Sequence, residues 1–262
     1  FSGVPGLPHE NDWGSLRIPD ADYDDARSAA YASKFLEAEH EKPFFLACGI
    51  FRPHLPWYVP RKYFDLYPLD EIIVPKVPDN DLDDLPAAGL ELAATRRSDL
   101  ITINNAGKRK EAIQAYLASI SYADAQLGRI LKTLAQSPSA ATTIIILWAD
   151  HGWHLGEKER WRKQTLWRES TRVPLIIVAP GISQAGTHTN APVSLMDLYP
   201  TLVELAGLEE PHDLEGVSLV PLLKNPGAPW DRAVVTTNGF RNHAVANERY
   251  RYIRYADGTE EL

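Results

Sequence analysis

An apolar run that stops abruptly at polar residues constrains this chain more than any other stretch. Residues 142–148, TTIIILW, are β-branched or apolar without a break, which predicts a strand buried on both faces inside a parallel sheet. Asp150, His151 and Gly152 follow almost at once. Because open α/β sheets hold ligands at the carboxyl ends of their strands, the adjacent carboxylate and imidazole predict a metal site. Gly152 is expected to permit a sharp backbone turn. The alternative is a loop cap or helix N-cap.

Positive charge gathers directly after this pair. The cationic side chains are Lys158, Arg160, Arg162, Lys163 and Arg168. Such donors bind anions, so the region combines a metal site with groups suited to an esterified oxyanion such as sulfate or phosphate.

A second set of polar side chains follows another apolar run. Residues 44–50, FFLACGI, predict a buried strand, and Arg52 and His54 come just after it. Pro53 and Pro56 fix their own backbone angles and are expected to hold His54 in a defined place. The alternative is a structural or simply exposed histidine.

The remaining pattern predicts an α/β domain over residues 1–225. Helices are expected over 26–39 and 110–135, a third buried strand over 173–181, and a helix over 198–208 behind a capping box at Ser194 and Asp197. Residues 70–107 are expected to be irregular, with a solvated acidic run at 79–84. Two strands around a turn near residue 247 predict that 226–262 begin a small antiparallel subdomain.

Composition excludes several classes of function. The 262 residues are 44% hydrophobic and 24% charged, as in soluble globular proteins, and no apolar run reaches the ~20 residues that span a bilayer. The net charge of −8 argues against binding to nucleic acid or to an anionic membrane. The single cysteine excludes an intrachain disulfide and a multi-cysteine metal site.

Four blocks of this sequence resemble a known family. They are FFLACGIFRPHLPW, YLASISYADAQLGRIL, ADHGWHLGE with WRK and VPLIIVAPG, and SLMDLYPTLVELAGL. In this order they resemble the sulfatases of the alkaline phosphatase superfamily, most closely the branch containing iduronate 2-sulfatase. The resemblance covers most of residues 43–208 and implies an alkaline-phosphatase-like fold, a mostly parallel sheet flanked by helices.

The resemblance also implies roles for the residues of the central stretch. Asp150 and His151 would bind one divalent cation, which is calcium in this family. Ligand chemistry alone would not select calcium, because calcium prefers oxygen and histidine suits softer metals. Lys163 matches a lysine that contacts the sulfate group. Trp153 and His154 lie where the family shapes its sugar pocket, with packing as the alternative role for Trp153.

The resemblance extends to the second loop. His54 matches a histidine that lies at the sulfate, close to the leaving oxygen, and Arg52 accompanies it as a substrate-binding candidate. A sulfated sugar is therefore the expected substrate, with neither nucleic acid nor membrane as a partner. A periplasmic or secreted location is also implied.

One departure from the family concerns the nucleophile. Sulfatases use a formylglycine made from the cysteine of a C-x-P-S-R motif, and the strand before it supplies further metal-binding aspartates. This sequence contains neither. Cys48 begins CGIFR, lacks the proline and serine, and is expected to be a core residue. We therefore expect the C-terminal two-thirds of a sulfatase, inactive by itself, whose fold an N-terminal segment completes.

Two other functions fit the same residues. A phosphodiesterase or phosphonate monoester hydrolase of the same superfamily would act on a similar tetrahedral oxyanion. A catalytically inactive module could bind sulfated glycans without cleaving them. An upstream C-x-P-S-R motif would favour an enzyme over the binding module.

Overall fold

The computed structural model describes residues 1–209 and 211–262 and divides the chain into two compact units. Unit 1 comprises Phe1–Lys76 and Arg97–Ala141, and unit 2 comprises Val77–Arg96 and Thr142–Leu262. Among the described residues, no helix has both the length and the apolar character needed to cross a membrane.

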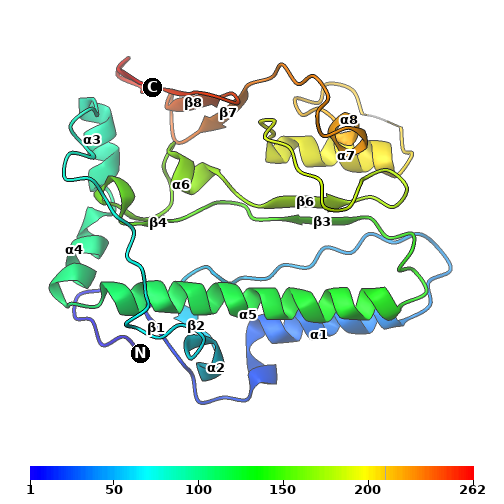
Figure 1. The fold of residues 1–262 in the computed structure, drawn as a ribbon, viewed down its shortest axis with the longest axis horizontal. Coiled ribbons are helices and arrows are strands. Elements are labelled where there is room, and N and C mark those ends of the chain that lie inside the picture. Colours follow the sequence, from blue (N-terminus) through cyan, green and yellow to red (C-terminus); the bar gives the residue numbers. More distant parts are fainter. Residues whose placement is uncertain (210) are drawn as a thin grey trace. The chain divides into compact units, whose positions relative to one another are not determined.

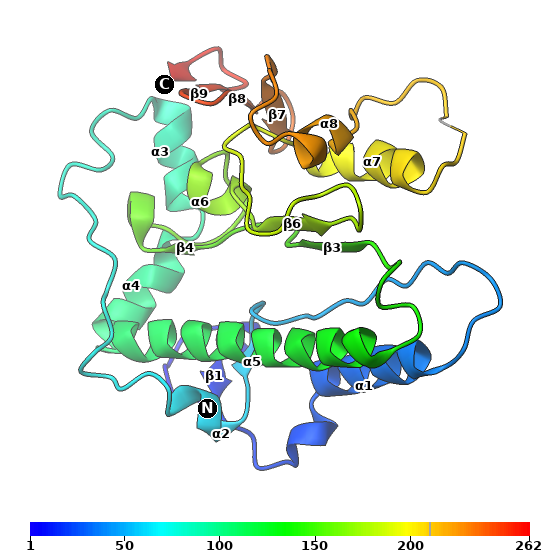
Figure 2. The ribbon, with the colours of Figure 1, turned by 45° about the vertical axis from the view of Figure 1, so that its right-hand side comes forward.

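Two long helices organise unit 1. Helices α1 (Asp24–Glu37) and α5 (Arg109–Gln136) lie side by side (Figures 1 and 2). Both confirm the helices predicted from apolar spacing. Alanines three residues apart are buried on each helix, and small side chains at this spacing let two helices approach closely. These alanines are Ala26, Ala29 and Ala32 on α1, and Ala112, Ala115 and Ala118 on α5.

The other elements of unit 1 are short. They are the parallel pair β1 (Trp13–Gly14) and β2 (Trp57–Tyr58), the helices α2 (Arg61–Phe64) and α4 (Arg97–Asn105), and the 3-10 turns η1 (His9–Asn11) and η2 (Asp20–Asp22). Trp57 is fully buried and its ring contacts those of Trp13 and Tyr116, which fixes β2 against β1 and α5. The loop that carries His54 ends at this anchored strand.

The apolar run of unit 2 forms a strand, but its pairing was predicted wrongly. Strand β3 (Ile145–Trp148) pairs with β6 (Leu175–Val178) in antiparallel register, with Trp148 opposite Leu175. Each strand has one partner in the described chain, so Trp148, Ile176 and Val178 remain between 45% and 55% exposed. An unbroken apolar run indicates a strand without fixing its direction. A parallel pair requires a crossover connection, usually a helix, whereas the connection after β3 folds back on itself.

The strand predicted over residues 44–50 is also absent from the described structure, where these residues belong to no sheet. Phe45 is 78% exposed, and Cys48 is exposed, contrary to the predicted core position. Apolar side chains favour a strand only when a neighbouring strand supplies the hydrogen bonds. Among the described residues only the short β1–β2 pair is parallel, so the mostly parallel sheet is not observed in this chain.

Residues 70–107 are more regular than predicted. They contain α3 (Ala87–Ala94) as well as α4. The sequence of α3, AAGLELAA, is rich in strong helix formers, but eight residues are too few to reveal a periodic pattern. Asp81, in the acidic run expected to be solvated, accepts a 2.7 Å hydrogen bond from the backbone N–H of Lys158.

The remaining elements of unit 2 lead to the C-terminal sheet. They are β4 (His154–Leu155), η3 (Glu157–Glu159), β5 (Trp161–Arg162), α6 (Arg168–Thr171), η4 (Leu195–Asp197), α7 (Leu198–Leu205), α8 (Val220–Lys224), β7 (Val234–Thr237), β8 (His243–Ala246), β9 (Arg251–Arg254) and β10 (Glu260–Glu261). Strands β7 to β10 form one antiparallel sheet, which confirms the predicted C-terminal antiparallel structure. The subdomain boundary between residues 225 and 226 stays a prediction.

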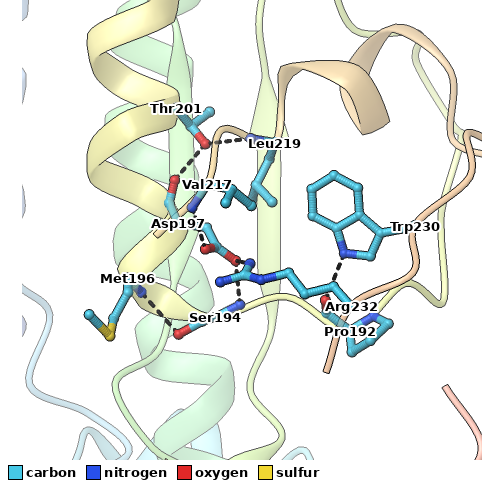
Figure 3. Close-up of polar contacts among 9 residues, drawn as sticks. All are labelled: Pro192, Ser194, Met196, Asp197, Thr201, Val217, Leu219, Trp230 and Arg232. Atoms are coloured by element: carbon cyan, nitrogen blue, oxygen red, sulfur yellow. Dashed lines mark hydrogen bonds and ion pairs between the residues drawn. The ribbon is translucent and has the colours of Figure 1, made fainter. Parts of the chain in front are cut away.

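A buried carboxylate holds the start of α7 in place (Figure 3). Asp197 is fully buried and accepts hydrogen bonds from the backbone N–H groups of Ser194 and Val217, at 2.7 and 3.0 Å. Arg232 pairs with the same carboxylate at 2.6 Å, and this partner compensates its burial. The capping box predicted at Ser194 and Asp197 is confirmed. Asp197 therefore joins three separate segments of unit 2.

Candidate functional site

The candidate residues of unit 2 lie in one loop, residues 149–174, which connects β3 to β6 (Figure 1). Its base is closed by two backbone hydrogen bonds, from Ala149 to Pro174 at 3.3 Å and from Gly152 to Ser170 at 2.8 Å. Further along, β4 pairs with β5 in antiparallel register. The loop is therefore a folded structure with its own ladder.

Gly152 is needed for a reason other than the expected turn. Its φ lies outside the left-handed region. A Cβ at this position would lie 2.0 Å from the carbonyl oxygen of Glu169 and 3.2 Å from that of Arg172. Only glycine lets the two sides of the loop approach this closely.

Three of the predicted residues converge at the base of this loop. The Lys163 ammonium lies 2.5 Å from Nε2 of His151, and the Asp150 carboxylate lies 3.7 Å from the same nitrogen. Nδ1 of His151 donates to the carbonyl oxygen of Gly152 at 2.8 Å. Since Nδ1 carries the proton, Nε2 presents its lone pair toward Lys163. The side chain of Asp150 is 84% exposed and that of His151 is 25% exposed, so the cluster borders solvent.

The charge of Lys163 depends on its surroundings. Burial lowers the pKa of the Lys163 ammonium below its ordinary value, the Asp150 carboxylate opposes this shift, and Arg162 adds to it. A partly desolvated ammonium attracts an anion more strongly than a fully hydrated one. The group can therefore bind one oxygen of a tetrahedral anion.

The donor set at this point fits a divalent cation in part. The hydrogen bond from Nδ1 to Gly152 orients His151 so that Nε2 can act as a ligand, the usual arrangement for metal-binding histidines. Asp150 adds a carboxylate, but among the described residues no third His, Cys, Asp or Glu completes a metal-binding group. Calcium takes six to eight oxygen ligands, so a site here needs further oxygens.

Trp153 and His154 lie next to this cluster in sequence but differ in environment. The ring of Trp153 is partly buried and lies 6.3 Å from that of His151. His154 is fully buried, and its Nε2 shares a 2.9 Å hydrogen bond with the hydroxyl of Thr165. Burial lowers the pKa of His154 to about 4, and Arg160 contributes to the shift. This geometry gives His154 a role inside the loop, and its contact with a sugar stays a prediction.

Arg52 and His54 lie together on a loop of unit 1. Asp25, on α1, is buried and accepts hydrogen bonds from the backbone N–H groups of Phe51 and Arg52, at 2.7 and 3.0 Å. Nδ1 of His54 donates to the carbonyl oxygen of Leu55 at 2.7 Å, so Nδ1 carries a proton. The arrangement parallels that of His151.

The side chain of Arg52 is held by the same loop. Its Nε donates to the carbonyl oxygen of Tyr58 at 3.3 Å. Burial lowers the pKa of Arg52, and Asp25 opposes that shift. The binding of a substrate by Arg52 stays a prediction.

Sequence reasoning missed two buried residues that support these loops. Asp25 lies in the first turn of α1, where acidic residues are common for reasons of the helix dipole alone, so its contacts with the second loop left no signal. Arg160 was identified only as part of the cationic cluster, whereas its side chain is fully buried. Neither partner set can be derived from spacing, because both depend on tertiary contacts.

Comparison with protein families gives two matches. The model of the sulfatase family matches residues 5–208, and the model of the C-terminal region of N-sulphoglucosamine sulphohydrolase matches residues 156–262. The loop 149–174 lies within the first match, and its part from residue 156 onward also lies within the second.

Curated relatives agree with these matches. A sulfatase from Formosa agariphila is 42% identical over 257 residues, which cover 96% of this chain and 50% of that protein. Iduronate 2-sulfatase from Homo sapiens is 32% identical over 235 residues, which cover 75% of this chain and 42% of that protein. The chain spans half or less of the length of these relatives.

Solved structures share the fold. A phosphonate monoester hydrolase from Silicibacter pomeroyi has a TM-score of 0.81 at 24% identity, covering 97% of this chain and 56% of that chain. A protein solved in complex with its substrate, D-glucosamine-2-N,6-O-disulfate, has a TM-score of 0.74 at 22% identity. The match covers 91% of this chain and 62% of that chain. These neighbours confirm an α/β fold of the alkaline phosphatase type. The family match over most of the described residues, together with these relatives, shows that the chain belongs to the sulfatase family.

Proposed function

We propose that the enzyme containing this sequence hydrolyses a sulfate ester on a carbohydrate. The observation that carries the proposal is the convergence of Asp150, His151 and Lys163, which brings a carboxylate, an imidazole and an ammonium to one point of the loop. A sugar substrate is supported by the similarity to iduronate 2-sulfatase and by a structural neighbour whose substrate is D-glucosamine-2-N,6-O-disulfate.

Lys163 and His54 would have separate roles in this reaction. The Lys163 ammonium would bind a sulfuryl oxygen and offset the negative charge that grows there in the transition state. As the sulfur–oxygen bond breaks, the departing sugar oxygen needs a proton. Nε2 of a protonated His54 would supply it, because Nδ1 is held by the carbonyl of Leu55. Arg52 would orient the substrate beside His54, and Trp153 and His154 would help to form the sugar pocket.

Two further groups would complete the site. Asp150 and His151 would hold a calcium ion, which when bound supplies positive charge to the sulfuryl oxygens. The nucleophile would be a formylglycine in an N-terminal segment outside this sequence, a segment that would also complete the fold. We propose that the chain by itself is inactive for this reason.

A single substitution tests the metal and substrate assignments. In the intact enzyme, Asp150→Ala should abolish hydrolysis of an aryl sulfate and remove the rise in melting temperature that calcium gives the wild type. Asp231→Ala, at an exposed position of the same unit, should change neither. Wild-type turnover in the Asp150 variant would refute the assignment.

The runner-up function is hydrolysis of a phosphodiester or phosphonate monoester. The structural similarity to a phosphonate monoester hydrolase favours it, because both substrates present a similar tetrahedral anion. Rates on an aryl sulfate and on an aryl phosphodiester, measured with one preparation, separate the two enzymes. A lack of hydrolysis with retained binding of a sulfated glycan would favour the non-catalytic module.

A further inference from the structure

The backbone around Lys163 has an unusual conformation. Its two neighbours, Arg162 and Gln164, have φ values of 74° and 69°, in the left-handed region that non-glycine residues seldom occupy. Lys158 and Glu159, with φ values of 52° and 50°, lie only a few residues earlier. Four of the six described non-glycine residues with positive φ therefore lie within residues 158–164. Such conformations persist only where surrounding contacts impose them.

Arg160 supplies these contacts from inside the loop. Its side chain is fully buried, and one terminal nitrogen, Nη2, donates to the carbonyl oxygens of Lys163 and Gln164 at 2.9 and 3.3 Å. The other, Nη1, donates to the carbonyl oxygen of Leu92 on α3, in the same unit. One guanidinium thus joins the backbone of Lys163 to a neighbouring helix.

The preceding turn is attached to the same part of unit 2. The backbone N–H of Lys158 donates to the Asp81 carboxylate at 2.7 Å, and the Lys158 ammonium contacts the Asp81 carbonyl oxygen at 2.6 Å. The backbone N–H of Arg160 donates to the carbonyl of Glu157 at 3.1 Å. The backbone just before Arg160 in sequence is therefore held by contacts that do not involve Lys163.

We propose that Arg160 is a positioning residue for Lys163: its guanidinium fixes the left-handed backbone on both sides of Lys163 and so directs the ammonium toward His151 and the substrate anion. The inference rests on the proposed sulfate-binding role of Lys163. Arginine suits this task because its rigid planar fork holds its N–H donors in fixed directions, whereas the lysine ammonium is a compact charge on a flexible stem.

The charge state of Arg160 agrees with this role. Burial lowers the pKa of Arg160 to about 10, and Arg96 contributes to the shift, so the guanidinium remains protonated at neutral pH. Three backbone carbonyl oxygens then stabilise a buried positive charge.

A double-mutant cycle in the intact enzyme tests the inference. Arg160→Lys keeps the charge and removes the fork, and should lower kcat/KM for an aryl sulfate by about 10- to 100-fold, the cost of misplacing a group by roughly 1 Å. In a Lys163→Ala background the same change should have an effect below about twofold, because no ammonium remains to be positioned. Arg172→Lys, an exposed position of the same loop, is the matched control and should behave as the wild type.

A second measurement on the intact enzyme tests the physical contact without activity. Amide hydrogen exchange at residues 162–165 should be faster in Arg160→Lys than in Arg172→Lys. Equal exchange in the two variants would overturn the inference. An equal loss of kcat/KM from Arg160→Lys in the wild type and in the Lys163→Ala background would also overturn it. Arg160 would then act on the fold as a whole. Wild-type activity in Lys163→Ala would instead refute the proposed role of Lys163, and the inference with it.

Discussion

At the scale of single residues, backbone partners decide what each candidate side chain can do. His54 and His151 each donate their Nδ1 proton to the carbonyl oxygen of the following residue. In each ring Nδ1 therefore carries the proton, and the proposed roles, an acid for His54 and a metal ligand for His151, concern Nε2. The sequence identifies both histidines, but their tautomers follow from rotamers and local backbone geometry.

The carboxylate of Asp25 provides a test at this scale. Asp25→Asn replaces one acceptor with an NH₂ group that faces a backbone N–H, so the free energy of unfolding should fall by about 1–3 kcal/mol. Hydrogen exchange at Phe51 and Arg52 should become faster. Asp24→Asn is the matched control, because Asp24 is exposed and lies in the same first turn of α1. A similar loss of stability in both variants would show that only the helix dipole matters. Urea unfolding of the intact enzyme provides the measurement.

At the scale of elements, the loop between β3 and β6 carries the candidate site. Its conformation depends on the antiparallel pairing of the two strands, because the residues that leave β3 face those that enter β6. The hydrogen bond from the Gly152 N–H to the Ser170 carbonyl continues the pairing of the two sides of the loop beyond the sheet. Asp150, His151 and Lys163 meet because the loop is closed at its base.

Replacing Gly152 tests this closure. In Gly152→Ala the new methyl group would overlap the Glu169 carbonyl, so the two sides of the loop must separate. We expect a loss of about 1–3 kcal/mol in the free energy of unfolding, as for other overpacked sites. Gly128→Ala on α5 meets no atom within 4 Å and should instead stabilise the chain by roughly 0.5–1 kcal/mol. Wild-type stability in the Gly152 variant, measured by urea unfolding, would contradict the close approach.

At the scale of the whole molecule, buried polar groups couple stability to pH. His154 lies inside unit 2, away from water and within reach of the charge of Arg160. Its folded pKa of about 4 lies below the ordinary value of 6.5. Between these two pH values the unfolded chain binds a proton that the folded chain does not bind.

The free energy of unfolding should therefore decrease as the pH falls from 6.5 to 4, by up to about 3 kcal/mol from this residue. Above pH 6.5 this contribution should be constant. His154→Gln should remove it and flatten the pH dependence of urea unfolding over this interval, whereas His188→Gln, at an exposed position, should not. An unchanged slope in the His154 variant would contradict the assignment.

Local features were predictable where a local pattern produces them. The apolar spacing of α1 and α5, the capping box at Ser194 and Asp197, and the C-terminal hairpin all follow from interactions between residues close in sequence. Helix α3 was missed because its eight residues are too short for periodicity. The strand over 44–50 and the core position of Cys48 were predicted wrongly, because each needs a partner from elsewhere in the chain.

The order of residues alone determined which side chains adjoin the end of β3, and the metal site that a carboxylate beside an imidazole predicts there stays a prediction. Only the tertiary structure decided that Lys163, twelve positions beyond His151, returns to within 2.5 Å of it. The physical reason is that this return depends on antiparallel pairing, on the close approach at Gly152 and on a buried guanidinium. The pairing, the approach at Gly152 and the bond from Arg160 to Leu92 join residues that are distant in sequence, so no local pattern records them.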